Sequence, residues 1–130
     1  MRSFFQNIFS ILICILLINS VNDLQAYALG DVDWVLIEDN ELGKQWIDQG
    51  SLERLNNNEI KVLTKFFERS TKNKDKGSTD LYVMRINCEN KNFKDISING
   101  LPNINAKWNS SNNDELIDSV IDRSCSLIIN

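Results

Sequence analysis

Few residue types in this sequence could carry chemistry, because its 130 residues include no histidine. Catalysis by an imidazole base, Ser-His or Cys-His nucleophiles and the commonest zinc ligand sets are therefore excluded. A carboxylate pair such as Glu38 with Asp48 could support acid–base hydrolysis only at a defined separation, and nothing in the sequence sets one. The acidic group at 31–41 lacks the ligand spacing of a calcium loop. The sequence predicts a protein that is not an enzyme and holds no cofactor or metal.

One basic segment, at 65–76, is a candidate site for an acidic protein or a glycan. Its positive side chains outnumber Glu68 and Asp75. They are Lys65, Arg69, Lys72, Lys74 and Lys76. Ser, Thr, Asn and Gly separate these charges, which is typical of a solvated loop, and we favour that interpretation.

The three tryptophans, Trp34, Trp46 and Trp108, are the second candidate group. Together they could form a stacking surface for a sugar or a peptide. In so short a chain, however, large aromatic side chains usually dominate the core. We therefore expect these residues to supply much of the core.

The N-terminus has the pattern of a signal peptide. Residues 8–18 form an apolar segment of the length expected for a signal-peptide core, and 26–28 offer the small-x-small pattern of a cleavage site. We expect a signal peptide at 1–28, cleaved after Ala28, and a single domain at 29–130. The apolar segment is short of the ~20 residues that a transmembrane helix needs, although an uncleaved anchor remains the alternative.

Cleavage would leave two of the three cysteines in the mature chain. It removes Cys14 and leaves Cys88 and Cys125, which should pair in the oxidising conditions that exported proteins meet. Closing a loop of this length stabilises a fold by about 4 kcal/mol. Two buried free thiols are the alternative.

Short apolar runs bounded by Asn, Asp, Gly and Lys predict β-strands through most of the mature chain. The expected strands are 32–37, 44–48, 60–69, 81–88 and 93–98, and the segment 51–55 is ambiguous. Asn-rich turns separate several of them. Alternation in the fourth strand places Tyr82, Met84, Ile86 and Cys88 on one face.

Only the segment 114–124 has helical periodicity, with its apolar and charged side chains on opposite faces. Acidic residues lie at its start, and Arg123 lies where the helix dipole favours a cation. Cys125 follows at the apolar edge, so a bond to Cys88 would hold this helix against the sheet. The predicted fold is α+β: an antiparallel sheet of about five or six strands with one C-terminal helix packed on it, stapled by a disulfide.

The order of the residues along the mature chain resembles that of the surface-adhesin protein E family. The residues that carry the resemblance are Trp34, Trp46-Ile47-Asp48, Ser51-Leu52, Arg54, Ile60, Val62, Cys88, Phe93, Trp108 and Cys125. The resemblance implies a small exported bacterial protein in which a disulfide ties a C-terminal helix to an antiparallel sheet. It also implies a non-enzymatic surface protein, because the best-studied member of the family binds host matrix proteins, and it leaves a homodimer open. The partner of this chain, a protein or a glycan, stays unknown.

The partner itself is not identified by the resemblance, because the loops here are rich in Asn and no Pro follows Trp108. The formal net charge of −4 argues against nucleic acid, and no stable membrane span is expected after cleavage. Location on the cell surface, in the extracellular space or in the periplasm fits an exported chain. Two alternatives stay open: a periplasmic accessory or scaffold protein, and a small-ligand binder whose pocket between helix and sheet is lined by Trp108 and Tyr82.

Overall fold

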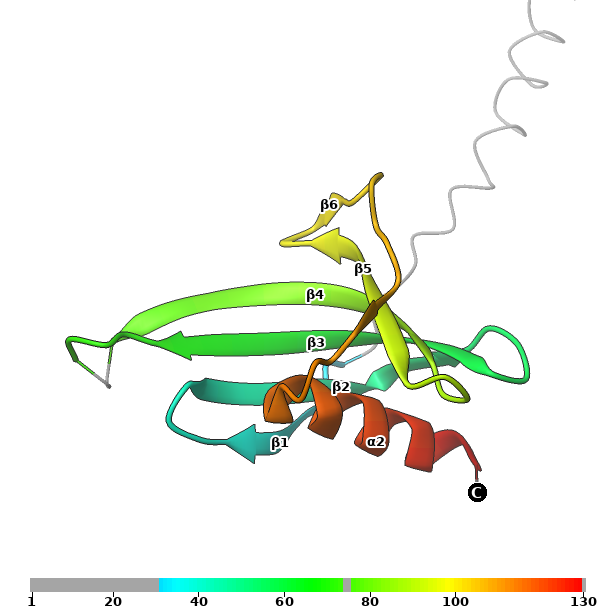
Figure 1. Cartoon of the computed structure of the whole chain (residues 1–130), viewed down its shortest axis with the longest axis horizontal. Coiled ribbons are helices and arrows are strands. Elements are labelled where there is room, and N and C mark those ends of the chain that lie inside the picture. The colour runs from blue at the N-terminus through cyan, green and yellow to red at the C-terminus, as the bar shows by residue number, and fades with distance from the viewer. Residues whose placement is uncertain (1–30, 74–75, 130) are drawn as a thin grey trace, which may run out of the picture.

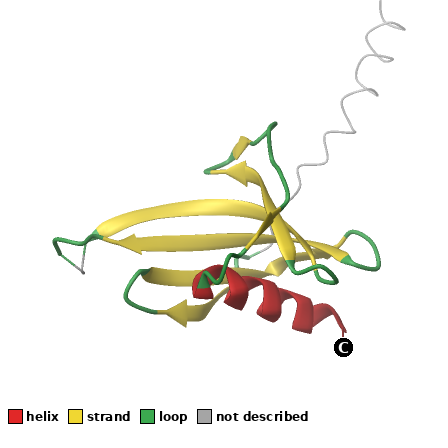
Figure 2. Cartoon of the chain, in the orientation of Figure 1, coloured by secondary structure: helices red, strands yellow, loops and turns green. Residues whose placement is uncertain are grey.

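A computed structural model of the chain describes residues 31–73 and 76–129, which form an antiparallel sheet and one helix (Figures 1 and 2). The elements are β1 (Trp34–Asp39), β2 (Gly43–Arg54), β3 (Glu59–Arg69), β4 (Gly77–Asn87), β5 (Asn92–Ile98), β6 (Leu101–Pro102), β7 (Asn109–Ser110) and α2 (Glu115–Ile129). The strands pair in the order β1-β2-β3-β4-β5-β6, and β7 also pairs with β5. The predicted α+β class is confirmed.

Asparagine side chains close several of the turns between neighbouring strands. Asn40 Oδ1 accepts hydrogen bonds from the backbone N–H groups of Leu42 and Gly43, at 2.9 and 3.3 Å. Asn56 does the same for Asn58 and Glu59, at 3.0 and 2.9 Å. Such local bonds satisfy backbone donors where the strand ladder stops, so the Asn-rich loops have a structural role.

The helix packs across one face of the sheet, chiefly against β1, β2 and β3 (Figure 1). Alternation along each strand directs one set of side chains toward it. The buried core between helix and sheet consists mainly of Ile47, Ile60, Val62, Met84, Ile86, Val120 and Ile121. All of these side chains are aliphatic, so the core contains none of the tryptophans that we expected to supply it.

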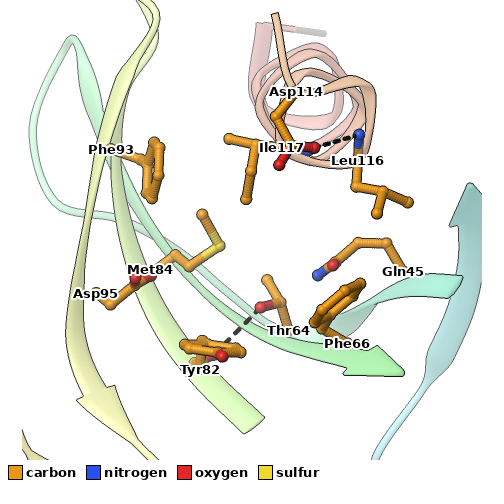
Figure 3. Close-up of a pocket in the computed structure, with 10 residues that line it drawn as sticks. All are labelled: Gln45, Thr64, Phe66, Tyr82, Met84, Phe93, Asp95, Asp114, Leu116 and Ile117. Carbon is orange, nitrogen blue, oxygen red and sulfur yellow. Dashed lines mark hydrogen bonds between the residues drawn. The ribbon is translucent and has the colours of Figure 1, made fainter. Parts of the chain in front are cut away.

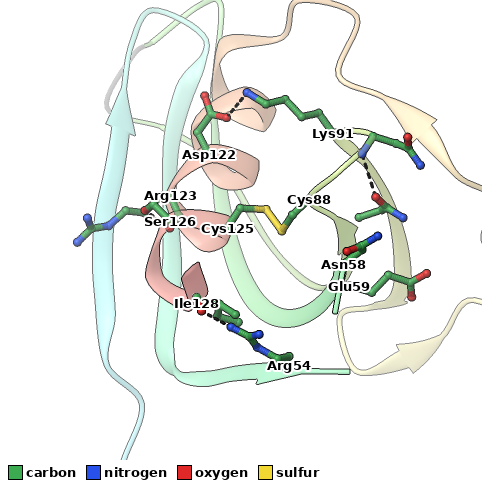
Figure 4. Close-up of a disulfide and its surroundings, with 12 residues drawn as sticks. Arg54, Asn58, Glu59, Cys88, Lys91, Asp122, Arg123, Cys125, Ser126 and Ile128 are labelled. Carbon is green, nitrogen blue, oxygen red and sulfur yellow. Dashed lines mark hydrogen bonds and ion pairs between the residues drawn. A yellow bond between two sulfur atoms is a disulfide. The ribbon is translucent and has the colours of Figure 1, made fainter. Parts of the chain in front are cut away.

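Three elements are clearly longer than the sequence predicted. Strand β4 begins at Gly77 and not at residue 81. Strand β2 runs through Gly50 and the ambiguous segment to Arg54, with an irregularity in its pairing to β3 after Asp48. The helix continues to Ile129, so Arg123 is not in its last turn, which contains no basic residue. The cation at its C-terminal end comes from β2 instead: the Arg54 guanidinium donates to the backbone carbonyl of Ile128 (Figure 4).

The predicted disulfide between Cys88 and Cys125 is confirmed, with a Cα–Cα distance of 5.7 Å (Figure 4). It joins the turn after β4 to the C-terminal half of α2. Among the described residues, no helix is long and apolar enough to cross a membrane. The predicted signal peptide and its cleavage site after Ala28 lie outside the described residues. Lys74 of the basic segment also lies outside them.

Candidate functional site

Within residues 31–73 and 76–129, no helix covers the face of the sheet that points away from α2. The pairing register places Leu36, Trp46, Lys65 and Leu81 in one row across β1, β2, β3 and β4. Of these side chains, Leu36 is 47% and Leu81 38% exposed. We call this surface the helix-free face and define it by Trp34, Leu36, Trp46, Leu63, Lys65, Phe67, Leu81 and Val83. Uncovered apolar side chains of this kind mark interaction surfaces.

Lys65 lies against two tryptophan rings at the centre of the helix-free face. Its Nζ is 4.5 Å from the ring centroid of Trp34 and 4.5 Å from that of Trp46. Both distances are in the range of a cation–π interaction, in which the ammonium is attracted to the negative face of the ring. No carboxylate of the described residues pairs with Lys65. The three side chains therefore form a fixed, amphipathic cluster with one free positive charge.

Trp108 makes a separate cation–π contact with a single lysine, Lys94 of β5. Lys94 Nζ lies 4.7 Å from the Trp108 ring centroid, and the tryptophan is 39% exposed. The expectation that the tryptophans supply the core is thus wrong for all three. Trp46 precedes Ile47 on one strand, and because neighbouring side chains point to opposite faces, only one of them can face the helix.

The basic segment at 65–76 does not form a single patch. Lys65 is stacked on the tryptophans, and Arg69 binds the carboxylate of Asp39 and the backbone carbonyl of Asn40, the latter at 2.9 Å. Lys72 and Lys76 are exposed in the β3–β4 loop. The structure thus separates the candidate residues that it describes.

The acidic residues near the N-terminal strand also have structural partners. Asp39 pairs with Lys44 at 3.1 Å and also with Arg69. These bonds, of which the one to Lys44 has the larger effect, hold the pKa of Asp39 below its usual value. Glu38 accepts a hydrogen bond from Ser119 Oγ at 3.1 Å, whereas Asp48 accepts one from the backbone N–H of Asp33 at 2.8 Å. Within 31–73 and 76–129, no three His, Cys, Asp or Glu residues cluster as metal ligands would.

On the opposite face, a cavity of about 320 Å³ opens between the first turn of α2 and the strands β2 to β5 (Figure 3). Its lining residues are Gln45, Thr64, Phe66, Tyr82, Met84, Phe93, Asp95, Asp114, Leu116 and Ile117. The prediction of a pocket between helix and sheet lined by Tyr82 fits this cavity, but Trp108 does not line it. Trp108 packs instead on Lys94.

Gln45 and Asp95 are polar side chains of this cavity that have no partner among the described residues. Gln45 is only 3% exposed, and its amide makes no hydrogen bond there. The Asp95 carboxylate is half-buried and makes neither a hydrogen bond nor an ion pair there. Burial raises the pKa of Asp95 above its usual value. The pKa of Tyr82 is also raised, mainly by burial and to a smaller extent by the negative charges of Asp80 and Asp95. The sequence analysis did not identify Gln45 or Asp95, because neither belongs to a motif.

Comparison with known proteins gives one match. The family model described as the surface adhesin-E family matches residues 35–130, from β1 to the end of the chain. No curated protein and no solved structure matches the chain. The match covers both cysteines of the disulfide and all the strands that form the helix-free face, apart from the first residue of β1. The chain belongs to the surface adhesin-E family.

Proposed function

We propose that this protein is an exported, non-enzymatic binding protein and that its helix-free face holds a partner protein whose surface is apolar and acidic. The single observation that carries the proposal is the cluster of Trp34, Lys65 and Trp46 at the centre of that face. Membership of a family of surface adhesins supports a binding role. The disulfide supports export, because such bonds persist in oxidising compartments.

The cluster has the physical properties of a binding hot spot. Tryptophans contribute large contact areas at little entropic cost, and they are enriched among the residues that dominate interface energies. Lys65 holds both rings in place before a partner arrives, since its ammonium contacts each of them. A partner would therefore meet a surface that needs little reordering, which favours affinity.

Charge complementarity indicates what the partner carries. The other cations near the face are neutralised within the chain: Lys44 by Asp39, Lys61 by Glu53 and Arg85 by Glu59. Lys65 and Lys94 contact aromatic rings and have no carboxylate partner among the described residues. Acidic groups on the partner would complete these two sites.

The aliphatic side chains favour a protein partner over a glycan. Leu36 and Leu81 flank the cluster in the same row and are 47% and 38% exposed. A sugar can stack on a tryptophan ring but would leave these leucines in water. An apolar protein surface would bury them at a gain of about 25 cal/mol for each Å² removed from water.

The proposal includes a signal peptide at 1–28, a single domain at 29–130 and display on the cell surface. A C-terminal tag on the full chain, expressed in its own host, tests the location. Protease or antibody added to intact cells should reach the tag. Protection of the tag until the outer envelope is opened would contradict display and support a periplasmic accessory role.

Binding is tested with the tagged chain on an array of purified extracellular-matrix proteins, with heparin as the glycan probe. Lys65→Met removes the charge but keeps the length of the side chain. It should weaken binding at least about tenfold, because both the ammonium and the order of the rings are lost.

The matched control is Lys91→Met, which removes an exposed lysine that pairs with Asp122 of α2 at 2.8 Å. Equal binding by the two variants would contradict the assignment to the helix-free face. Binding to heparin but to no protein on the array would show that the partner is a glycan and not a protein. Self-association that Lys65→Met abolishes, measured by sedimentation, would make a second copy of the chain the occupant.

A further inference from the structure

The cavity under α2 exists because the helix covers only part of the sheet. The helix packs chiefly on β1, β2 and β3, and side chains of β4 and β5 line the cavity beside its first turn. Phe66, Met84, Phe93, Leu116 and Ile117 give the cavity apolar walls. Its volume of about 320 Å³ lies at the small end of the range for sites that hold small organic molecules.

Gln45 and Asp95 are polar groups within these apolar walls that lack a partner among the described residues. Gln45 is 3% exposed and directs its amide into the cavity from β2 (Figure 3). Asp95 reaches the cavity from β5, and its carboxylate forms no ion pair with any described residue. Neither group is among the fully buried polar atoms without a partner, which in the described part of the chain are Asn92 Oδ1 and Ser124 Oγ, so solvent reaches both through the cavity. A ligand that displaces this solvent must replace its hydrogen bonds. A ligand that supplies hydrogen-bond donors and a positive charge would satisfy both groups.

The charges around the cavity exclude an anionic ligand. No Lys or Arg lines it, whereas Asp95 and Asp114 both do. The N-terminal N–H groups of α2 could otherwise attract an anion, but Asp114 occupies them. Its Oδ1 accepts from Leu116 at 3.0 Å and from Ile117 at 3.3 Å. An anion would therefore meet two carboxylates and no free cation or helix terminus.

We propose that this cavity binds a small organic cation, a protonated amine on an apolar body, with Asp95 as its counter-ion. The apolar body packs between Phe66, Phe93 and Ile117, and Gln45 is a polar lining residue that can hydrogen-bond to the ligand. The cavity lies on the face that carries α2, opposite the helix-free face. The inference therefore goes beyond the proposed function and does not depend on it.

The test uses three probes with the same phenyl body. Phenethylamine carries a positive charge at neutral pH, 2-phenylethanol carries none, and 3-phenylpropionate carries a negative charge. Binding to the chain, with its disulfide intact, is followed by calorimetry and by amide chemical shifts of the residues that line the cavity. We expect phenethylamine to bind at least about tenfold more tightly than 2-phenylethanol, and 3-phenylpropionate not to bind.

Two variants locate the charge that recognises the amine. Asp95→Asn should reduce the preference for phenethylamine over 2-phenylethanol to about one, because the neutral amide is not a counter-ion. Asp122→Asn removes an equal charge from the exposed surface of α2, away from the cavity, and should leave the preference unchanged.

Three results would overturn the proposal: equal affinity of the unsubstituted chain for phenethylamine and 2-phenylethanol, an unchanged preference in Asp95→Asn, or no binding of phenethylamine. The comparison of probes uses the unsubstituted chain, so it stands even if a variant fails to fold. Loss of amine binding here has no bearing on the matrix-protein array, which reports on the other face.

Discussion

Asp95 is a residue at which the fold gives up stability. Its carboxylate is half-buried, has no partner among the described residues and is held in apolar surroundings. Burial raises its pKa, which means that the charged form is less stable in the folded protein than in the unfolded chain. Residues that cost stability while lining a cavity are typical of functional sites, where stability is exchanged for binding.

The pKa of Asp95 predicts the effect of removing its charge. The folded protein keeps a proton on Asp95 over a pH range in which the unfolded chain has released it, so stability falls as pH rises through that range. Asp95→Asn should therefore raise the melting temperature at about pH 7. The gain should vanish below the ordinary pKa of 3.8, where both states are protonated. A lower melting temperature for Asp95→Asn at neutral pH would contradict this account.

At the scale of elements, the helix is held at both ends by groups that can be tested separately. Its first N–H groups are capped by Asp114, and its C-terminal half is tied to the turn after β4 by the disulfide. Its last carbonyls are met by Arg54 of β2, which lies far away in the sequence. The sequence pattern predicted the start of the helix and the cysteine pair but not this arginine.

Removal of the N-terminal cap should weaken the helix. Asp114→Ala leaves the N–H groups of Leu116 and Ile117 without their acceptor and should cost about 1 kcal/mol in the free energy of unfolding. Asp114→Asn is the matched control, because Asn caps about as well as Asp. Urea denaturation measures both variants. Equal stability of Asp114→Ala and the unsubstituted chain would show that the cap contributes nothing.

Loss of the disulfide should be the most damaging change to the contact between helix and sheet. Cys88→Ser frees the unfolded chain from a closed loop and should lower the melting temperature by at least about 10 °C under non-reducing conditions. The double variant with Cys125→Ser should melt at a similar temperature, which excludes an effect of the remaining free thiol. An unchanged melt in either variant would refute the stabilising role of the bond.

At the scale of the whole molecule, the sheet separates two candidate binding surfaces. The helix-free face carries Lys65 between two tryptophans, and the cavity on the opposite face carries Asp95 beneath the first turn of α2. The two residues have opposite charges and different surroundings. We therefore propose a different class of ligand for each surface.

Substitutions on the two faces should act independently. Lys65→Met should reduce partner binding and leave phenethylamine binding unchanged, and Asp95→Asn should do the reverse. In the double variant the changes in binding free energy should add to within about 0.5 kcal/mol, because the two sites share no contacts. A larger coupling, measured by calorimetry, would show that the sheet transmits a change from one face to the other.

The sequence alone determined the five longer strands in outline, the start of the helix, the cysteine pair and the family resemblance. These features depend on local periodicity, on turn residues such as Asn56 and on the number of cysteines, all of which can be read along the chain. Only the tertiary structure decided which side of the sheet the helix covers, and thus that Trp46 lies outside the core while Ile47 lies within it. It also placed Arg54 at the end of α2 and brought Gln45 and Asp95 to the same cavity. Those positions depend on strand register between distant segments, which the order of residue types does not specify.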